Sequence, residues 1–135
     1  MRGTRMALRI LVVDDDADVL TVIVEMLRVS GFIVTFADSG IAMREILSNK
    51  ESLAVDAVLL DCSMAGEASA QLALHAKSLR LPVVMISGSM EAMTFADEHG
   101  LQLLRKPFRM PELLAAIKEA IGSGEFGQRD SPISN

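Results

Sequence analysis

The chain has 135 residues, half of them apolar, and a formal net charge of −5 from 13 Lys and Arg against 18 Asp and Glu. This length and apolar content exclude a disordered chain and favour one domain with its own core, while the acidic balance argues against direct binding of nucleic acid. The lone cysteine, Cys62, excludes an internal disulfide, and no apolar run approaches the roughly 20 residues that span a bilayer, so we expect a cytoplasmic protein without membrane insertion.

The first predicted elements are a buried strand and a helix. Residues 8–13 are apolar on both faces of a strand, and the run ends at three acids, residues 14–16. Asp16 has the position of a helix N-cap, and apolar residues follow it at helical spacing, at Leu20, Ile23, Val24 and Leu27. The helix is predicted to end near Ser30, with Gly31 as its cap.

The same alternation of strand and helix continues to the end of the periodic region. Further strands are predicted at residues 33–36, 55–60, 83–86 and 101–105. Helices are predicted at residues 41–48, 68–79 and 90–99, and from Pro111 to residue 121. Residues 1–7 are an N-terminal extension, 8–121 the folded domain, and 122–135 a tail that we expect to be disordered. Strands buried on both faces and separated by helices indicate an α/β domain, a doubly wound five-stranded parallel sheet flanked by five helices.

Polar residues follow the first, third, fourth and fifth predicted strands: Asp14 and Asp15, then Asp61, Ser87 and Lys106. Ligands of doubly wound folds bind beyond the carboxyl ends of the strands, so these side chains are expected to meet at one edge of the sheet. Carboxylates gathered this closely repel one another, and a hard divalent cation relieves the repulsion. We therefore predict a magnesium site of three aspartates, with the backbone carbonyl of Ser63 as a further ligand.

A carboxylate beside magnesium, with an ammonium group and a hydroxyl nearby, is suited to attack phosphorus. The cation and the ammonium neutralise the phosphoryl oxygens while the carboxylate acts as nucleophile. The product is an acyl phosphate, which is labile and therefore suits a transient signal.

Four motifs carry a resemblance to a known family. Residues 10–16 (ILVVDDD), 56–61 (DAVLLD), 83–87 (VVMIS) and 106–108 (KPF) closely resemble the receiver (CheY-like) domain of bacterial two-component response regulators. The resemblance extends from about residue 8 to residue 121, in the right order along the chain. It implies the flavodoxin-like receiver fold.

The resemblance also implies a role for each polar residue. Asp61 matches the phosphoacceptor, Asp14 and Asp15 the acidic pair that holds magnesium, Ser87 the switch hydroxyl, and Lys106 the lysine that pairs with the phosphoryl group. The phosphoryl group would come from the phosphohistidine of a histidine kinase or a histidine phosphotransfer protein. The output would be altered binding to a downstream protein, by a monomer or a phosphorylation-dependent dimer. Such a domain catalyses only its own phosphorylation and dephosphorylation, and its Lys-Pro bond is typically cis.

Two positions depart from the family pattern. Leu103 stands where receivers commonly have Tyr or Phe, which implies a different or weaker readout through that position, because leucine offers far less area and no hydroxyl. Ala65 stands where they usually have proline. Ser63 and Ser89 would flank the water that hydrolyses the acyl phosphate, and neither is a strong general base.

Ordinary structural roles are expected for several other polar residues. Asp16 is favoured as a helix cap over a third metal ligand, and His75 and His99 as surface residues over metal ligands, because neither has cysteines or carboxylates at ligand spacing. Cys62 is favoured as a buried thiol that acts as a small hydrophobe.

Two other interpretations of the whole chain remain. An aspartate-dependent phosphatase of the haloacid dehalogenase type would carry a second acid two residues after the nucleophile, where this chain has Ser63. A receiver excised from a hybrid histidine kinase or a multidomain regulator would have the same features as a stand-alone receiver. The tail after residue 121 carries no helix-turn-helix pattern, which favours the stand-alone form if the chain is complete.

Overall fold

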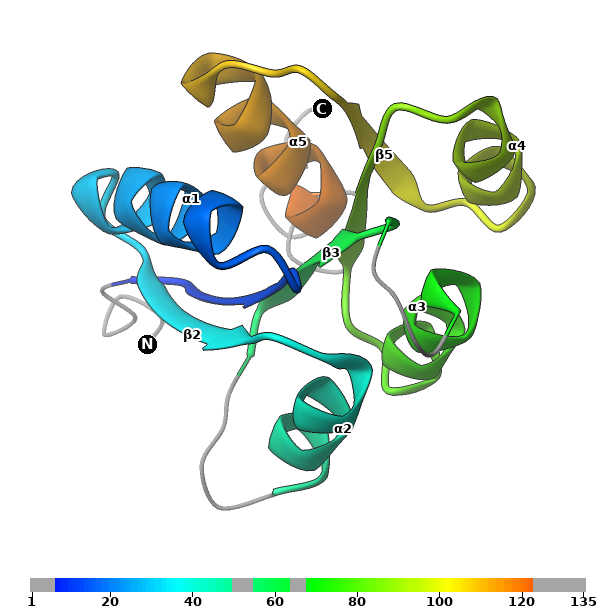
Figure 1. Ribbon diagram of the computed structural model, residues 1–135, viewed down its shortest axis with the longest axis horizontal. Helices are drawn as coiled ribbons and strands as arrows, with labels where there is room; N and C mark the ends of the chain where they lie inside the picture. Colours follow the sequence, from blue (N-terminus) through cyan, green and yellow to red (C-terminus); the bar gives the residue numbers. More distant parts are fainter. Residues whose placement is uncertain (1–6, 50–54, 64–67, 123–135) are drawn as a thin grey trace, which may run out of the picture.

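Strands and helices alternate strictly along the chain in the computed structural model, which describes residues 7–49, 55–63 and 68–122 (Figure 1). Within these residues the strands are β1 Arg9–Val13, β2 Ile33–Ala37, β3 Ala57–Asp61, β4 Val83–Ser87 and β5 Gln102–Arg105. The helices are α1 Ala17–Val29, α2 Gly40–Ser48, α3 Ser69–Ser78, α4 Met90–Glu98 and α5 Met110–Gly122. Nearly all of the predicted N-terminal extension and tail, and Ala65, lie outside the described residues.

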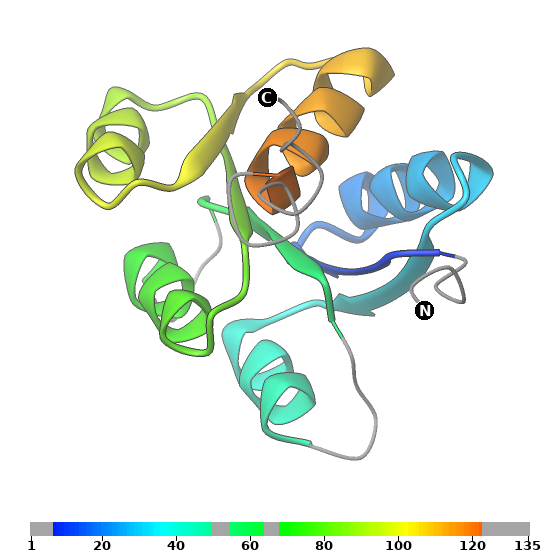
Figure 2. The same ribbon diagram turned by 180° about the vertical axis from the view of Figure 1, so that it is seen from behind.

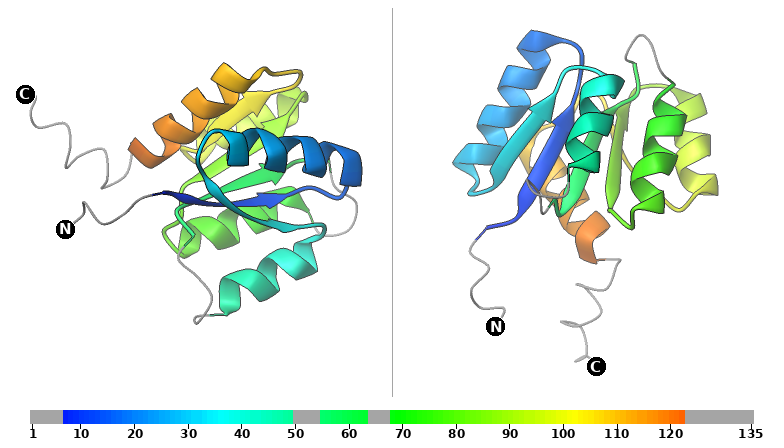
Figure 3. Two further views of the ribbon diagram at one scale, coloured as in Figure 1. Left: turned by 90° about the vertical axis from the view of Figure 1, so that its left-hand side faces the viewer. Right: turned by 90° about the horizontal axis from the view of Figure 1, so that it is seen from below.

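The five strands form one parallel sheet in the order β2-β1-β3-β4-β5. Their carboxyl ends therefore lie at the same edge, as the two views of Figure 3 show. The predicted α/β architecture is confirmed. After β1 the chain runs outward to β2 and then returns to pair β3 against the other side of β1, so the direction of strand order reverses between β1 and β3. In doubly wound folds this reversal opens the crevice that binds ligands.

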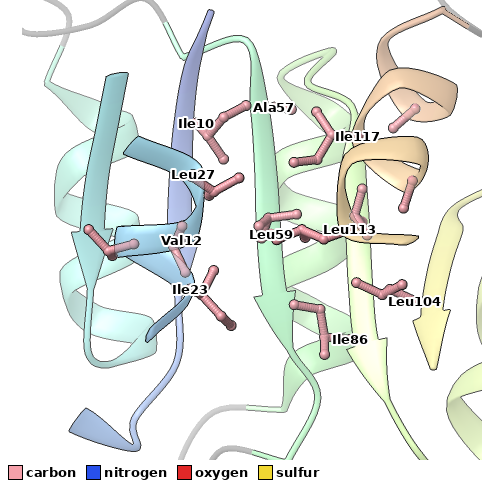
Figure 4. Packing of buried hydrophobic residues seen from close by; sticks show 14 of the residues in the cluster. Ile10, Val12, Ile23, Leu27, Ala57, Leu59, Ile86, Leu104, Leu113 and Ile117 are labelled. Atoms are coloured by element: carbon pink, nitrogen blue, oxygen red, sulfur yellow. The ribbon is translucent and has the colours of Figure 1, made fainter. Parts of the chain in front are cut away.

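One face of the sheet is covered by α1 and α5 (Figure 4). Large aliphatic side chains from both helices pack on the strands, among them Ile23, Leu27, Leu113 and Ile117. Their spacing of three and four residues places them on one side of each helix. We call this layer the α1/α5 face.

The other face is covered by α2, α3 and α4, as seen from behind in Figure 2. Met43 and Leu72 are its large buried helical side chains, and the other buried helical positions of this cluster are alanines: Ala73, Ala76 and Ala96. We call this layer the α2/α3/α4 face. Strands β3 and β4 are buried along their whole length between the two faces, which explains why each is apolar up to its last residue, Asp61 or Ser87.

Side chains and backbone geometry end the helices where the sequence suggests. Asp16 caps α1, because its carboxylate accepts from the backbone N–H groups of Asp18 and Val19 at 3.0 and 3.2 Å. Gly31, with φ of +98°, follows the end of α1 in a conformation that disfavours side chains. Helix α5 begins at Met110, one residue before the predicted start at Pro111.

No helix in the described part of the chain is long and apolar enough to cross a membrane.

Candidate functional site

The polar residues singled out in the sequence lie at the carboxyl edge of the sheet. Strand β1 ends at Val13 and continues into Asp14 and Asp15, and β3 ends on Asp61. Strand β4 ends on Ser87, and Lys106 follows β5. In the sheet, β1, β3, β4 and β5 are successive neighbours. The residues at the ends of these four strands therefore form one continuous site, which spans the point between β1 and β3 where the strand order reverses.

Asp14, Asp15 and Asp61 each offer one carboxylate oxygen to a group whose atoms all lie within 4.8 Å of one another. Asp14 and Asp61 are each 2% exposed, and Asp15 is exposed. The Oδ1 atom of Asp14 accepts from the N–H of Asp16 at 3.0 Å, whereas its buried Oδ2 atom has no hydrogen-bond partner within the described residues. A buried carboxylate oxygen without a donor, next to two further carboxylates, is a donor set that fits a hard cation.

Burial raises the pKa of Asp14 above its usual value. The hydrogen bond from Asp16 opposes this rise, and the charge of Asp61 adds to it. The fold therefore disfavours the charged form of this carboxyl relative to water, and a cation bound beside it would offset that effect.

Lys106 supplies the positive charge of the site. Its Nζ donates to Asp61 Oδ1 at 2.9 Å, and its side chain is 37% exposed against 3% for Asp61. Burial acts to lower the pKa of Lys106, but the hydrogen bond and the charge of Asp61 outweigh it, so the pKa is raised. The ammonium form therefore persists throughout the neutral range. The Lys106–Pro107 bond is cis, and the backbone N–H of Lys106 donates to the carbonyl of Ser87 at 3.1 Å.

Ser63, in the turn after β3, makes a contact that the sequence did not predict. Its Oγ lies 3.1 Å from Oδ1 and 3.0 Å from Oδ2 of Asp61. The prediction concerned its backbone carbonyl as a metal ligand, and that role stays a prediction. The Oγ of Ser69, at the start of α3, donates to the backbone carbonyl of Asp61 at 3.1 Å.

Ser87 is linked by its hydroxyl to the start of α4. It is 7% exposed, and its Oγ accepts from the N–H of Ser89 at 2.9 Å and donates to the Oγ of Ser89 at 3.3 Å. Ser89 is the N-cap of α4, because its Oγ accepts from the N–H of Ala92 at 3.1 Å. The serine pair thus joins the end of β4 to the first turn of α4.

Other residues considered in the sequence have structural contacts. His99 lies just after α4, with Nδ1 3.0 Å from the carbonyl of Phe95 and its ring packed against the Phe95 ring. Leu103 is half-buried in β5 and packs on the α2/α3/α4 face. Cys62 is half-buried on the same face, where burial, followed by the charge of Asp61, raises the pKa of its thiol to about 11.

One structural aspartate was missed. Asp56 Oδ2 accepts from the backbone N–H of Arg9 at 2.7 Å and so ties the start of β1 to the start of β3. The predicted strand at residues 55–60 includes Asp56, whereas β3 begins at Ala57. A polar residue at the edge of an apolar run was the available signal, because such a residue commonly serves a neighbouring backbone group.

Residues 10–118 match the family model described as response regulator receiver domain. The chain is 38% identical over 115 residues to the transcriptional regulatory protein PrrA of Mycobacterium leprae, covering 82% of this chain and 48% of that protein. It is 32% identical over 126 residues to the transcriptional regulatory protein GltR of Pseudomonas aeruginosa, covering 88% and 51%. The chain thus spans about half the length of these relatives.

Among solved structures, the fold is similar to that of a CheY-like response regulator receiver domain protein from Methanospirillum hungatei. The TM-score is 0.76 at 27% sequence identity, and the match covers 90% of this chain and 98% of that one. A receiver domain protein from Clostridium thermocellum gives a TM-score of 0.77 at 26% identity, with 88% and 98% covered.

Proposed function

The chain belongs to the response regulator receiver domain family of two-component signal transduction, as the sequence motifs suggested, and from that premise we propose that Asp61 accepts a phosphoryl group and thereby switches the domain. The observation that carries the proposal is the pairing of Lys106 Nζ with Asp61 Oδ1 at 2.9 Å, beside two further aspartates at the strand ends. An acceptor carboxylate, a cation that stays charged and an acidic metal cluster are the groups that phosphoryl transfer needs.

The metal site is part of the proposal. Asp14, Asp15 and Asp61 would hold Mg²⁺, with the backbone carbonyl of Ser63 as a further ligand, and the orphaned Oδ2 of Asp14 supports this assignment. When bound, Mg²⁺ would supply positive charge to offset the negative charge of the phosphoryl oxygens.

In the proposed step, an oxygen of Asp61 attacks the phosphorus of a phosphohistidine on a partner protein. The new O–P bond forms as the P–N bond breaks, and the departing imidazole keeps the electron pair and takes up a proton. Lys106, already hydrogen-bonded to Asp61, pairs with the transferred oxygens. Attack by water later releases inorganic phosphate and restores the carboxylate, so the domain acts on its own phosphoryl group rather than on a separate substrate.

The proposed readout passes through the serine pair at the start of α4. A phosphoryl group on Asp61 is a stronger acceptor than the Oγ of Ser89, so the hydroxyl of Ser87 would donate to it instead. Ser89 would then lose that contact, although it still caps α4 through the N–H of Ala92. Leu103 cannot act as an aromatic switch, which leaves the start of α4 as the element most directly coupled to Ser87.

The proposed partners are a histidine kinase or a histidine phosphotransfer protein upstream and a protein target downstream, all in the cytoplasm. The relatives PrrA and GltR are transcriptional regulatory proteins about twice as long as the matched region. We therefore favour a receiver that controls an attached output domain over a stand-alone domain. In that case the output domain would contact nucleic acid, and this acidic receiver would not.

Phosphorylation by a small donor tests the core of the proposal. The full chain is incubated with acetyl phosphate and Mg²⁺, and its intact mass is measured with time. Wild type is expected to gain one phosphoryl group, and Asp61→Asn none. Asp18→Asn, which changes an exposed acid in the first turn of α1, is the matched control and should behave as wild type.

A wild-type chain that gains no phosphoryl mass from a small donor or from a histidine kinase would overturn the proposal. Incorporation that persists undiminished in Asp61→Asn would place the acceptor elsewhere. Omission of Mg²⁺ should slow incorporation strongly in wild type, because the three carboxylates would then repel the donor without a compensating charge.

A further inference from the structure

We infer that the hydroxyl of Ser63 restrains the phosphoacceptor: it donates to the Asp61 carboxylate in the resting protein and must turn away before that carboxylate attacks phosphorus. The inference rests on the proposed function, because it concerns the rate at which Asp61 becomes a nucleophile. It assigns to Ser63 a side-chain role that is separate from the predicted role of its backbone carbonyl.

The geometry places this hydroxyl on both oxygens of the acceptor. Its Oγ lies 3.1 Å from Oδ1 and 3.0 Å from Oδ2 of Asp61, and a hydroxyl has a single proton, so the hydrogen bond is shared between the two oxygens. Ser63 is an exposed residue, whereas Asp61 is 2% exposed. The hydroxyl therefore reaches from the surface onto a buried carboxylate, which has little other access to solvent.

The hydrogen bond from Ser63 is expected to raise the barrier to attack on phosphorus. The electron pair that forms the new O–P bond belongs to a carboxylate oxygen, and a donor bound to that oxygen stabilises it before reaction. Only interactions that are stronger in the transition state than in the ground state accelerate a reaction. Lys106 meets this condition because its ammonium can pair with the incoming phosphoryl oxygens, while a neutral hydroxyl shared by both oxygens of Asp61 chiefly stabilises the resting carboxylate.

The same hydrogen bond competes with cation binding. A metal held by Asp14, Asp15 and Asp61 must draw on an oxygen of Asp61, and both oxygens are already engaged by Ser63. Removal of the hydroxyl should therefore strengthen Mg²⁺ binding in the absence of any phosphodonor. This gives a readout that is independent of phosphoryl transfer.

The backbone around Asp61 is held by other groups, so the hydroxyl can be removed without moving the acceptor. The N–H of Cys62 donates to the carbonyl of Ile86 at 2.9 Å, and the Oγ of Ser69 donates to the carbonyl of Asp61 at 3.1 Å. Truncation of the exposed Ser63 side chain leaves both bonds in place.

The test compares wild type with Ser63→Ala, which removes the hydroxyl, and with Ser78→Ala, which removes an exposed hydroxyl bonded to the carbonyl of His75 on α3, away from the site. The rate of phosphorylation by acetyl phosphate at limiting Mg²⁺ is followed by intact mass, and Mg²⁺ affinity is measured separately by isothermal titration calorimetry. We expect Ser63→Ala to be phosphorylated about fivefold faster and to bind Mg²⁺ about threefold more tightly, the size expected for loss of a hydrogen bond of typical net strength. Ser78→Ala should stay within about twofold of wild type in both measurements.

Each outcome supports or overturns the inference. Slower phosphorylation of Ser63→Ala would show that the hydroxyl assists transfer and would overturn the inference. An unchanged rate together with an unchanged Mg²⁺ affinity would show that the hydroxyl neither restrains Asp61 nor competes with the cation. If wild type takes up no phosphoryl group at all, the proposed function fails, and the calorimetric comparison still decides whether Ser63 holds Asp61. Urea unfolding of the three proteins checks that the substitutions leave the fold intact.

Discussion

The two faces of the sheet differ in the size of the helical side chains that are buried against them. On the α1/α5 face, leucine and isoleucine side chains from both helices fill the space above the strands. On the α2/α3/α4 face, alanine occupies most of the buried helical positions of the cluster, and α4 contributes the buried Ala96 and the half-buried Phe95 to it. Since the stabilisation from burial follows the apolar area removed from water, α1 is held to the sheet much more strongly than α4.

The site uses this difference. Lys106 leads from β5 into α5 on the face with large buried helical side chains, while Ser87 leads from β4 into α4 on the face where most of these side chains are alanine. Under the proposed function, both residues would sense the same acceptor, Asp61. A charge added there is therefore expected to leave α5 in position and to shift the start of α4, because a helix held by small side chains costs less to move.

The largest expected effect is on the α1/α5 face. Leu27→Ala removes a fully buried leucine of α1, so we expect the free energy of unfolding to fall by about 3 kcal/mol, as measured by urea denaturation. The control is Val29→Ala on the same helix, where the side chain is 73% exposed and a change within about 0.5 kcal/mol is expected. If Leu27→Ala lowered the free energy of unfolding by no more than the control, the large buried side chains of α1 would not hold it firmly to the sheet. The contrast between the two faces would then be lost.

Two helix caps on the other face give a smaller effect and a sharper test of the switch. Ser39 caps α2 and Ser89 caps α4, each through its Oγ and a backbone N–H at 3.1 Å. Replacement of either by alanine should cost about 1 kcal/mol. Only Ser89→Ala should alter how phosphorylation changes hydrogen exchange in α4, because Ser89 alone of the two contacts Ser87. The same response in Ser39→Ala would show that the serine pair does not transmit the signal.

The acidic cluster should cost stability when no cation is present. The pKa of Asp14 is raised in the folded protein, so its contribution to stability is present below its ordinary value of 3.8 and is lost as the pH rises through the raised value. At neutral pH without Mg²⁺, Asp14→Asn should therefore unfold at a higher urea concentration than wild type. This change in the unfolding midpoint should be smaller than the change caused by either cap substitution.

That difference should shrink as the pH falls toward 3.8, the ordinary pKa of the carboxyl. Addition of Mg²⁺ should stabilise wild type and leave Asp14→Asn nearly unchanged, which would reverse their order. A wild-type protein that is more stable than Asp14→Asn in metal-free buffer would contradict the raised pKa of this carboxyl.

The last prediction concerns chemical reactivity rather than stability and uses Cys62 as a reporter on the α2/α3/α4 face. A thiol pKa raised from 9.0 to about 11 leaves little thiolate near neutral pH. The reaction of the native protein with a disulfide reagent near pH 8 should be about 100-fold slower than that of the denatured chain. Since the chain has one cysteine, the rate reports a single site. Equal rates in the two states would show that this face opens readily.

The strands and the edge of the sheet that carries the site were predictable because both follow from pattern. A run such as residues 83–86, apolar on both faces, specifies a strand buried between two layers, and a polar residue after it specifies the strand end. The cap at Asp16 follows equally from residue type and place.

The hydrogen bonds of the serines were not predictable in this way. Ser63 and Ser89 each follow a site residue by two positions, and this spacing does not determine side-chain rotation about the Cα–Cβ bond. The small size of the buried residues on α3 and α4 was visible in the sequence, but periodicity alone does not distinguish an alanine that anchors a helix from a leucine that does so more firmly.

The spread of the site along the chain has a consequence for synthesis. Asp14 lies near one end of the described residues and Lys106 near the other, and strand β5, which precedes Lys106, pairs only with β4. During synthesis on the ribosome, the three aspartates of the site are therefore made before Lys106. Under the proposed function, an unfinished chain cannot be phosphorylated until nearly the whole sheet has assembled. Only molecules with a completely folded receiver domain would then take part in signalling.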